Sequence, residues 1–191
     1  MKSNPEKFIH SSTPSVKKIK IPVKDLAVFA VLGTIMYISR VVMAGIPSVH
    51  ILGLIIASVT IAYRVRALIP IYVYVMLEGI FAGFSLWWLP YTYMWLILWA
   101  MFMLAGKLKI PNVIKIPLYM VVCGLHGMSF GILWAPAQAL MFNFSFEMTV
   151  ACVMAGFWFD LVHGISNFAA GSLILPLSEL LKILDKRRMT A

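Results

Sequence analysis

Long apolar segments separated by short polar or Pro- and Gly-containing connections make up the chain from residue 25 onward. Most of these segments approach or exceed the roughly 20 residues that a helix needs to cross a membrane. The stretch 51–63 is shorter, because it would span only about 20 Å at 1.5 Å per residue. The pattern predicts six helices, at 25–44, 51–63, 67–84, 91–106, 116–142 and 148–180.

The composition indicates that these helices form a membrane bundle. The chain is 62% hydrophobic and 12% charged, whereas soluble domains are about 45–50% apolar and about 25% charged. We therefore expect an all-α membrane protein with one six-helix domain over 23–185. A disordered basic tail at 1–22 and a second basic tail at 186–191 would flank it.

The distribution of positive charge predicts how the bundle is oriented. The formal net charge is +9, and the Lys and Arg residues gather in the two tails and in the connections around Arg64/Arg66 and Lys107/Lys115. If both termini are cytoplasmic, fifteen of the sixteen Lys and Arg residues lie on the inner side, with Arg40 as the exception. This asymmetry follows the positive-inside rule. It favours a multi-pass membrane protein, in contact with lipid, over a nucleic-acid-binding protein.

Polar residues within the predicted last helix are candidates for ligand binding. A charged side chain costs about 2.5–3.5 kcal/mol at the centre of a membrane helix, so it is normally retained for a partner or a ligand. Asp160, His163 and Asn167 recur at i, i+3 and i+7, which places them on one helical face. We interpret them as polar ligand contacts, although Asp160 and His163 could instead satisfy each other. His126, in the fifth helix, is either a ligand contact or a core histidine.

Arg40 and Glu78 are the remaining ionisable residues within the spans. They lie near the outer ends of the first and third predicted helices. Either they pair with each other and fix the packing of these helices, or they contact a ligand.

Aromatic residues gather at the outer end of the fourth helix. Trp87 and Trp88 are explained by an interfacial aromatic belt. Tyr91, Trp95 and Trp99 recur every four residues and form one face that enters the membrane. A deep indole needs a partner for its N–H, and stacked rings suit a flat heterocycle. We therefore include these three residues in a candidate binding pocket.

Two common motifs, one of nucleotide-binding proteins and one of metalloproteases, are absent from the sequence. It has no G-x-x-x-x-G-K-[ST] loop and no H-E-x-x-H pair. Cys123 and Cys152 lie in apolar segments and are interpreted as core residues, so no metal and no cofactor is expected. Phe159-x-x-x-His163 and His163-x-x-x-Asn167 resemble two motifs of CAAX-protease-like membrane enzymes, but the paired Glu of that family is missing. We expect a protein that is not an enzyme.

The chain resembles the substrate-binding S component of energy-coupling factor (ECF) vitamin transporters. The resemblance covers roughly residues 22–185. It rests on the six helices, the short second helix and the segments 68–79, Trp87-Trp88 and 159–168. It implies an ABC-type transport subunit that captures a water-soluble vitamin or vitamin precursor, a flat heterocycle or a corrinoid, at the outer face. The S component then topples in the membrane, and a T component and two ATPase subunits drive uptake.

The resemblance also assigns roles to particular residues. A small-residue stripe on the first helix, made of Ala27, Ala30 and Thr34, would dock to the T component. The Gly45–His50 connection would act as a lid over the pocket formed by the aromatic and polar residues above. A stand-alone carrier coupled to protons through Glu78 or Asp160 is the alternative function.

Overall fold

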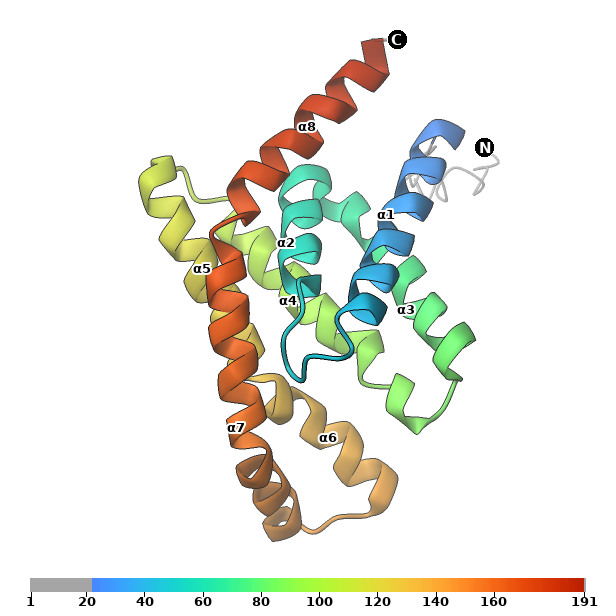
Figure 1. The fold of residues 1–191 in the computed structure, drawn as a ribbon, viewed down its shortest axis with the longest axis vertical. Helices are drawn as coiled ribbons and strands as arrows, with labels where there is room; N and C mark the ends of the chain where they lie inside the picture. The colour runs from blue at the N-terminus through green and yellow to red at the C-terminus, as the bar shows by residue number, and fades with distance from the viewer. Residues whose placement is uncertain (1–21, 191) are drawn as a thin grey trace, which may run out of the picture.

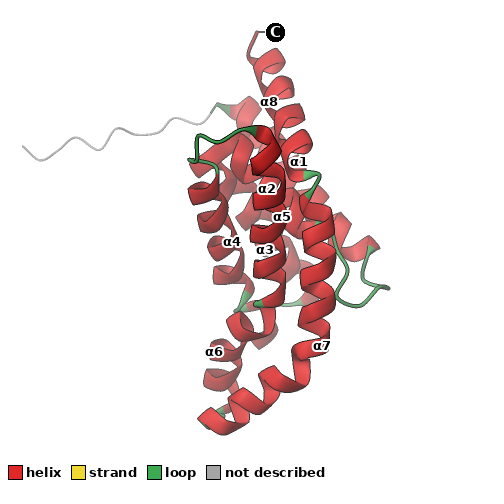
Figure 2. Ribbon diagram, turned by 90° about the vertical axis from the view of Figure 1, so that its left-hand side faces the viewer, coloured by secondary structure: helices red, strands yellow, loops and turns green. Residues whose placement is uncertain are grey.

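The computed structural model describes residues 22–190, and over this range the chain consists of helices joined by short connections (Figures 1 and 2). The predicted all-α class is therefore confirmed, while the expected tail at 1–22 lies outside the described residues except for Pro22. The elements in chain order are α1 (Val23–Val42), α2 (Leu52–Tyr63), the 3-10 helix η1 (Arg64–Ala67), α3 (Leu68–Ala82), the 3-10 helix η2 (Leu86–Trp88), α4 (Tyr91–Ala105), α5 (Asn112–Met128), α6 (Phe130–Phe142), α7 (Phe146–Gly171) and α8 (Ile174–Thr190).

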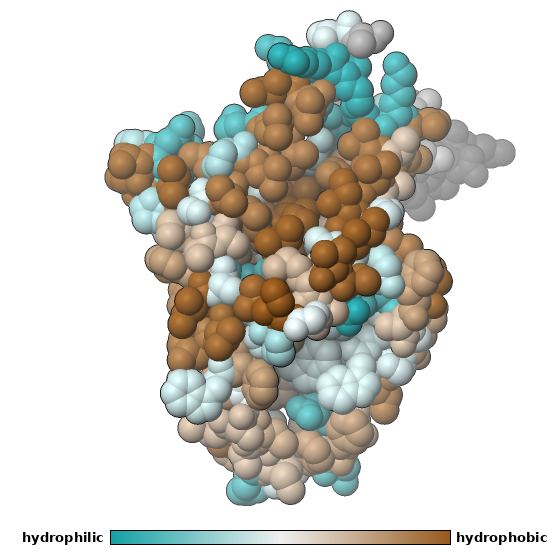
Figure 3. Space-filling model, viewed as in Figure 1, coloured by the Kyte–Doolittle hydropathy of each residue, from teal (hydrophilic) through white to brown (hydrophobic). Residues whose placement is uncertain are grey.

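Several helical stretches are long and apolar enough to cross a membrane. In the described range these are Val23–Val42, Leu52–Ala82, Leu86–Ala105, Asn112–Phe142 and Phe146–Gly171. Their outward faces are also apolar: on α7, Trp158 is 71% and Phe159 is 63% exposed. Figure 3 shows a broad brown band of hydrophobic residues below a teal, hydrophilic end. Exposed apolar surface of this extent is typical of contact with lipid or a partner rather than water.

Two ion pairs show how α1, α2 and α3 run relative to one another. Asp25, at the start of α1, pairs with Arg66 just before α3 at 2.7 Å. Arg40, near the end of α1, pairs with Glu78 near the end of α3 at 3.3 Å. α1 and α3 are therefore parallel, and α2, which connects the end of α1 to the start of α3, runs antiparallel to both. We call the end with Asp25 and Arg66 the basic end, and the end with the 43–51 connection, η2 and the α6–α7 connection the aromatic end.

The short helix α2 forms the centre of the bundle. Every residue of α2 except Ala62 is buried, and the helix packs against α1, α4, α7 and α8. Small residues such as Ser58 permit this close contact. The Ser58 hydroxyl donates to the carbonyl of Leu54 at 2.8 Å within α2 and reaches that of Ile174 in α8 at 3.3 Å. The predicted short second helix is thus confirmed, and its twelve residues extend over only about 18 Å.

The last two predicted helices are each divided. The segment predicted at 116–142 begins at Asn112 and breaks at Ser129, and the segment predicted at 148–180 breaks at Ser172 and Leu173. At the first break the Gly131 amide donates to both carboxylate oxygens of Asp160, at 3.1 Å each. A carboxylate is favourable at a helix N-terminus, so this contact stabilises a new helix start. Residues 186–190, expected in a tail, continue α8.

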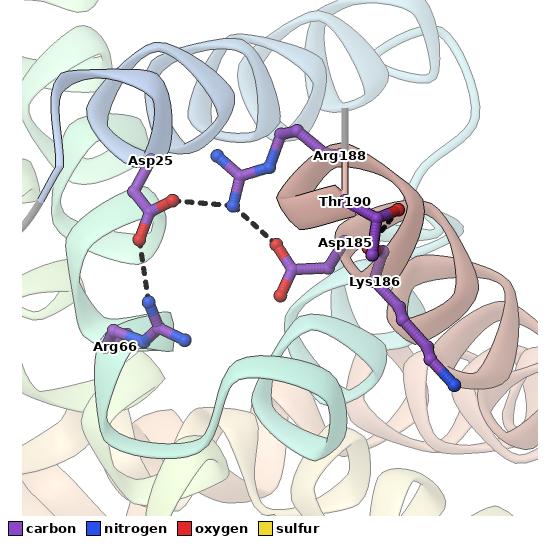
Figure 4. A network of polar contacts seen from close by, with 6 residues as sticks. All are labelled: Asp25, Arg66, Asp185, Lys186, Arg188 and Thr190. Carbon is purple, nitrogen blue, oxygen red and sulfur yellow. Dashed lines mark hydrogen bonds and ion pairs between the residues drawn. The ribbon is translucent and has the colours of Figure 1, made fainter.

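A network of charged residues joins three segments at the basic end (Figure 4). Asp25 accepts from Arg66 at 2.7 Å and also pairs with Arg188 of α8 at 2.6 Å. Arg188 pairs in turn with Asp185 at 2.6 Å. Its hydrogen bonds to Asp185 and Asp25 raise the pKa of Arg188. The network therefore fixes the end of α8 against the start of α1 and against η1.

We expect Asp25→Asn to lower the free energy of unfolding by about 1–2 kcal/mol, because it leaves two arginines without their shared carboxylate. Asp25 is buried while both arginines are partly exposed, which keeps the loss below that of a fully buried pair. The melting temperature of the purified protein in detergent measures the effect. Glu179→Gln is the matched control, because its pair with Lys182 is exposed on both sides. Equal losses in both variants would contradict the network's stabilising role.

Candidate ligand-binding site

Two neighbouring cavities lie at the aromatic end of the bundle. Their volumes are about 340 and 400 Å³, and both are lined by Trp87, Tyr91 and Trp134. We call the two together the aromatic cleft. Figure 3 shows a recess in the lower half of the molecule, bordered by pale, weakly polar side chains. Concave, mostly apolar sites of about 300–1,000 Å³ with a few polar groups are typical of small-molecule binding.

Three elements position the shared aromatic walls. Trp87 lies on η2, Tyr91 begins α4 and Trp134 lies on α6. The indole N–H of Trp88 donates to the carbonyl of Val75 at 2.7 Å, which holds η2 against α3. Trp87 and Tyr91 then contact Trp134 with ring centroids 5.6 and 5.5 Å apart. The cleft wall is therefore assembled from segments far apart in the sequence.

The ion pair of Arg40 and Glu78 forms the polar side of the smaller cavity. The Glu78 side chain is only 2% exposed, whereas the Arg40 side chain is 38% exposed. The predicted contact between the first and third helices is thus present. Because both residues also line the cavity, the two interpretations of the pair, packing and ligand contact, are compatible with each other.

A chain of aromatic rings leads from the cleft into the bundle. Tyr91 stacks on Trp95 with centroids 6.1 Å apart and an interplanar angle of 11°, and Trp95 contacts Tyr74 at 6.0 Å. Over the described residues, Trp95 Nε1 is buried without a hydrogen-bond partner, and Trp95 lines neither of the two cavities. An unsatisfied buried polar atom costs about 1–3 kcal/mol. The Trp95 N–H is therefore a candidate for contact with a buried water.

The connection between α1 and α2 covers one side of this region. The Ser166 hydroxyl of α7 donates to the carbonyl of Ser48 at 3.3 Å. The His50 ring lies 4.4 Å from that of His163, which in turn lies 4.8 Å from Phe130. Burial lowers the pKa of His50, and the positive charge of Arg40 lowers it further. The connection is thus held against α7 by a hydrogen bond and a pair of imidazoles.

The residues of the predicted polar stripe on the last helix, Asp160, His163 and Asn167, do not form one site. Asp160 holds the Gly131 amide at the start of α6, while His163 faces the connection and Phe130. Asn167 lies deeper, where its side chain fills the space left by Gly53 and Gly127. None of the three residues lines the two cavities. Asp160 and His163 contact Gly131 and Phe130, which do, and Asn167 packs within the helix crossing.

Two other predicted site residues have partners elsewhere. The indole N–H of Trp99 donates to the carbonyl of Arg64 at 3.1 Å, toward the basic end. His126 Nε2 lies 3.2 Å from the carbonyl of Met94, which agrees with a core histidine. Neither residue is among those that line the aromatic cleft.

Sequence reasoning missed the contribution of α6 and of the α7 residues opposite it. Phe130 and Trp134 could have been found from their four-residue spacing, which places two aromatic rings on one helical face. Cys152 was interpreted as a core residue, but it is half-buried and lines the larger cavity, whereas Cys123 is fully buried. The remaining lining residues there are Gly131, Gln138, Val153 and Gly156.

In the described part of the chain, no group of three or more His, Cys, Asp or Glu residues is arranged to hold a metal ion. No protein-family profile, curated protein or solved structure matches the chain. The chemistry of the site therefore has to be inferred from its own residues. These offer aromatic stacking, one guanidinium and a few polar side chains.

The position of His50 predicts a pH dependence of stability. Its pKa is lowered in the folded state, whereas an unfolded histidine has a pKa of about 6.5. Stability that depends on neutral His50 is therefore present above about pH 6.5 and is lost as the pH falls below that value. We expect the melting temperature of the wild type to fall more than that of His50→Gln between about pH 7.5 and about pH 5. Parallel falls in the two proteins would exclude His50 as the titrating group.

Proposed function

We propose that the protein is a membrane-embedded solute-capture subunit, the S component of an ECF-type transporter for a water-soluble vitamin or vitamin precursor. The observation that carries the proposal is the aromatic cleft, with its Arg40–Glu78 ion pair, at the end of an apolar helical bundle. A small polar-lined cleft of this kind suits binding of one small molecule.

The two ends of the bundle support an outward-facing cleft. The basic end holds Arg64, Arg66 and the network around Arg188. By the positive-inside rule this end belongs in the cytoplasm. The aromatic cleft lies at the opposite end and would then open toward the outside, where a scarce nutrient is captured.

The contacts of Glu78 and Asp160 argue against the alternative function, a proton-coupled carrier. Glu78 is paired with Arg40, and Asp160 accepts two contacts from the Gly131 amide. A carrier needs an acid that gains and loses its proton during the cycle. Protonation of either residue would remove its negative charge and weaken the contact that holds a wall of the cleft.

Uptake measurements in proteoliposomes separate the two functions. We expect the protein alone to bind a vitamin from a panel, detected as a rise in melting temperature, without accumulating it. Accumulation should need the T component, both ATPase subunits and ATP, and it should survive collapse of the proton gradient. Uptake by the protein alone that collapses with the gradient would instead establish the carrier.

The exposed face of α1 provides a test of assembly. Ala27, Ala30 and Thr34 are all exposed, while Phe29 and Met36 on the other face are buried. Small residues permit close helix contact in lipid, so we expect Ala30→Leu to reduce co-purification with a co-expressed T component and to leave ligand binding unchanged. Ala155→Leu on the exposed face of α7 is the control. Equal co-purification of both variants would place the docking face elsewhere.

A further inference from the structure

We propose that the ligand of the aromatic cleft is a planar aromatic molecule that carries an acidic group, with its ring against Trp87, Tyr91 and Trp134 and its acidic group on the guanidinium of Arg40. This inference rests on the proposed function, because it names the chemical class of solute that the same cleft would capture.

The charges at the cleft favour an anionic group over a cationic one. Of the described residues that line the two cavities, Arg40 and Glu78 are the ones that carry charge. The Glu78 side chain is almost fully covered and faces Arg40 Nε, whereas the Arg40 side chain retains 38% of its exposure. The charge presented to a ligand is therefore the positive charge of the guanidinium.

The geometry of the pair leaves Arg40 able to bind a second anion. A guanidinium has five N–H groups, and the contact of Arg40 with Glu78 is made through Nε, which lies 3.3 Å from Glu78 Oε1. The terminal nitrogens remain and form the planar fork that suits a carboxylate or a phosphate. The hydroxyl of Tyr91 neighbours the same guanidinium and adds a further polar group for the ligand.

The aromatic walls place a ring beside this charge. Trp87, Tyr91 and Trp134 line the cavity that contains Arg40 and continue into the larger cavity. Trp87 and Trp134 are tilted by 40° to each other, and Tyr91 and Trp134 by 85°, so the site offers both ring faces and ring edges. Gln138 in the larger cavity provides an amide for a polar substituent on the ring.

A cationic ligand would be disfavoured in this cleft despite its aromatic walls. Rings of Trp and Tyr do attract cations. Here, however, a cation would lie beside the exposed guanidinium, while the carboxylate of Glu78 is already covered and paired. Repulsion from Arg40 would therefore oppose the attraction of the rings.

The experiment identifies what the cleft retains. Full-length protein in detergent is incubated with yeast extract, washed and denatured, and the released compounds are identified by mass spectrometry in both ion polarities. We expect a compound with an aromatic ring and a carboxylate or a phosphate, and its identity distinguishes these two acids. The neutral amide or ester of that compound should bind at least about tenfold more weakly than the acid in titrations followed by tryptophan fluorescence.

Variants separate the role of Arg40 from general damage. We expect Arg40→Gln to weaken binding of the released compound by about tenfold or more, with a smaller loss in Arg40→Lys, which keeps the charge but lacks the fork. Arg187→Gln removes one exposed positive charge at the basic end and should bind normally. Because Arg40→Gln leaves Glu78 unpaired, the double variant Arg40→Gln/Glu78→Gln provides a folded form without a buried unpaired charge.

The outcomes distinguish this inference from the proposed function. A retained compound that is cationic, neutral or non-aromatic would overturn the inference and leave solute capture intact. So would unchanged affinity in the Arg40 variants. If the wild type retains no compound, solute capture itself fails, and the inference fails with it.

Discussion

The central constraint on this fold is a helix too short to reach both ends of the bundle that surrounds it. α2 has twelve residues and is buried along nearly its whole length, so its neighbours pack around it toward the basic end. At the aromatic end there is no α2 to pack against. The aromatic cleft lies there instead, lined by side chains of η2 and α6 together with residues near the ends of α1, α3, α4 and α7.

The Arg40–Glu78 pair joins two helices and at the same time forms part of the cleft wall. α1 and α3 approach closely at Gly33, where a Cβ atom would collide with Val73 and with the carbonyl of Pro70. This close packing brings Arg40 and Glu78 together near the aromatic end. In apolar surroundings neither charge is tolerated alone, so Glu78 keeps the guanidinium in place at the cleft wall.

The sequence predicted the helical class and the short second helix, because each follows from local pattern. The pairing of Arg40 with Glu78, which the structure contains, was one of two interpretations that the cost of an isolated charge left open. The break at Ser129 was not predicted, since hydropathy continues across it. It depends on Asp160, which lies about thirty residues further along the chain and binds the Gly131 amide. The hydrogen-bond partner of Trp99 could not be predicted either, because an indole can donate to any carbonyl within reach. In the structure that carbonyl belongs to Arg64. Residue type indicated that a partner was needed, but only the packing of the helices determines which one.

The way α6 is attached has an evolutionary consequence. Within α6 only Ala135 and Ala137 are buried, and the helix packs mainly against α7, yet it supplies Phe130, Trp134 and Gln138 to the cleft. Substitutions at these three positions would alter the shape and polarity of the cavity with little effect on the packing around α2. In a scaffold of this kind the cleft can change by substitutions in one peripheral helix while the rest of the bundle stays the same.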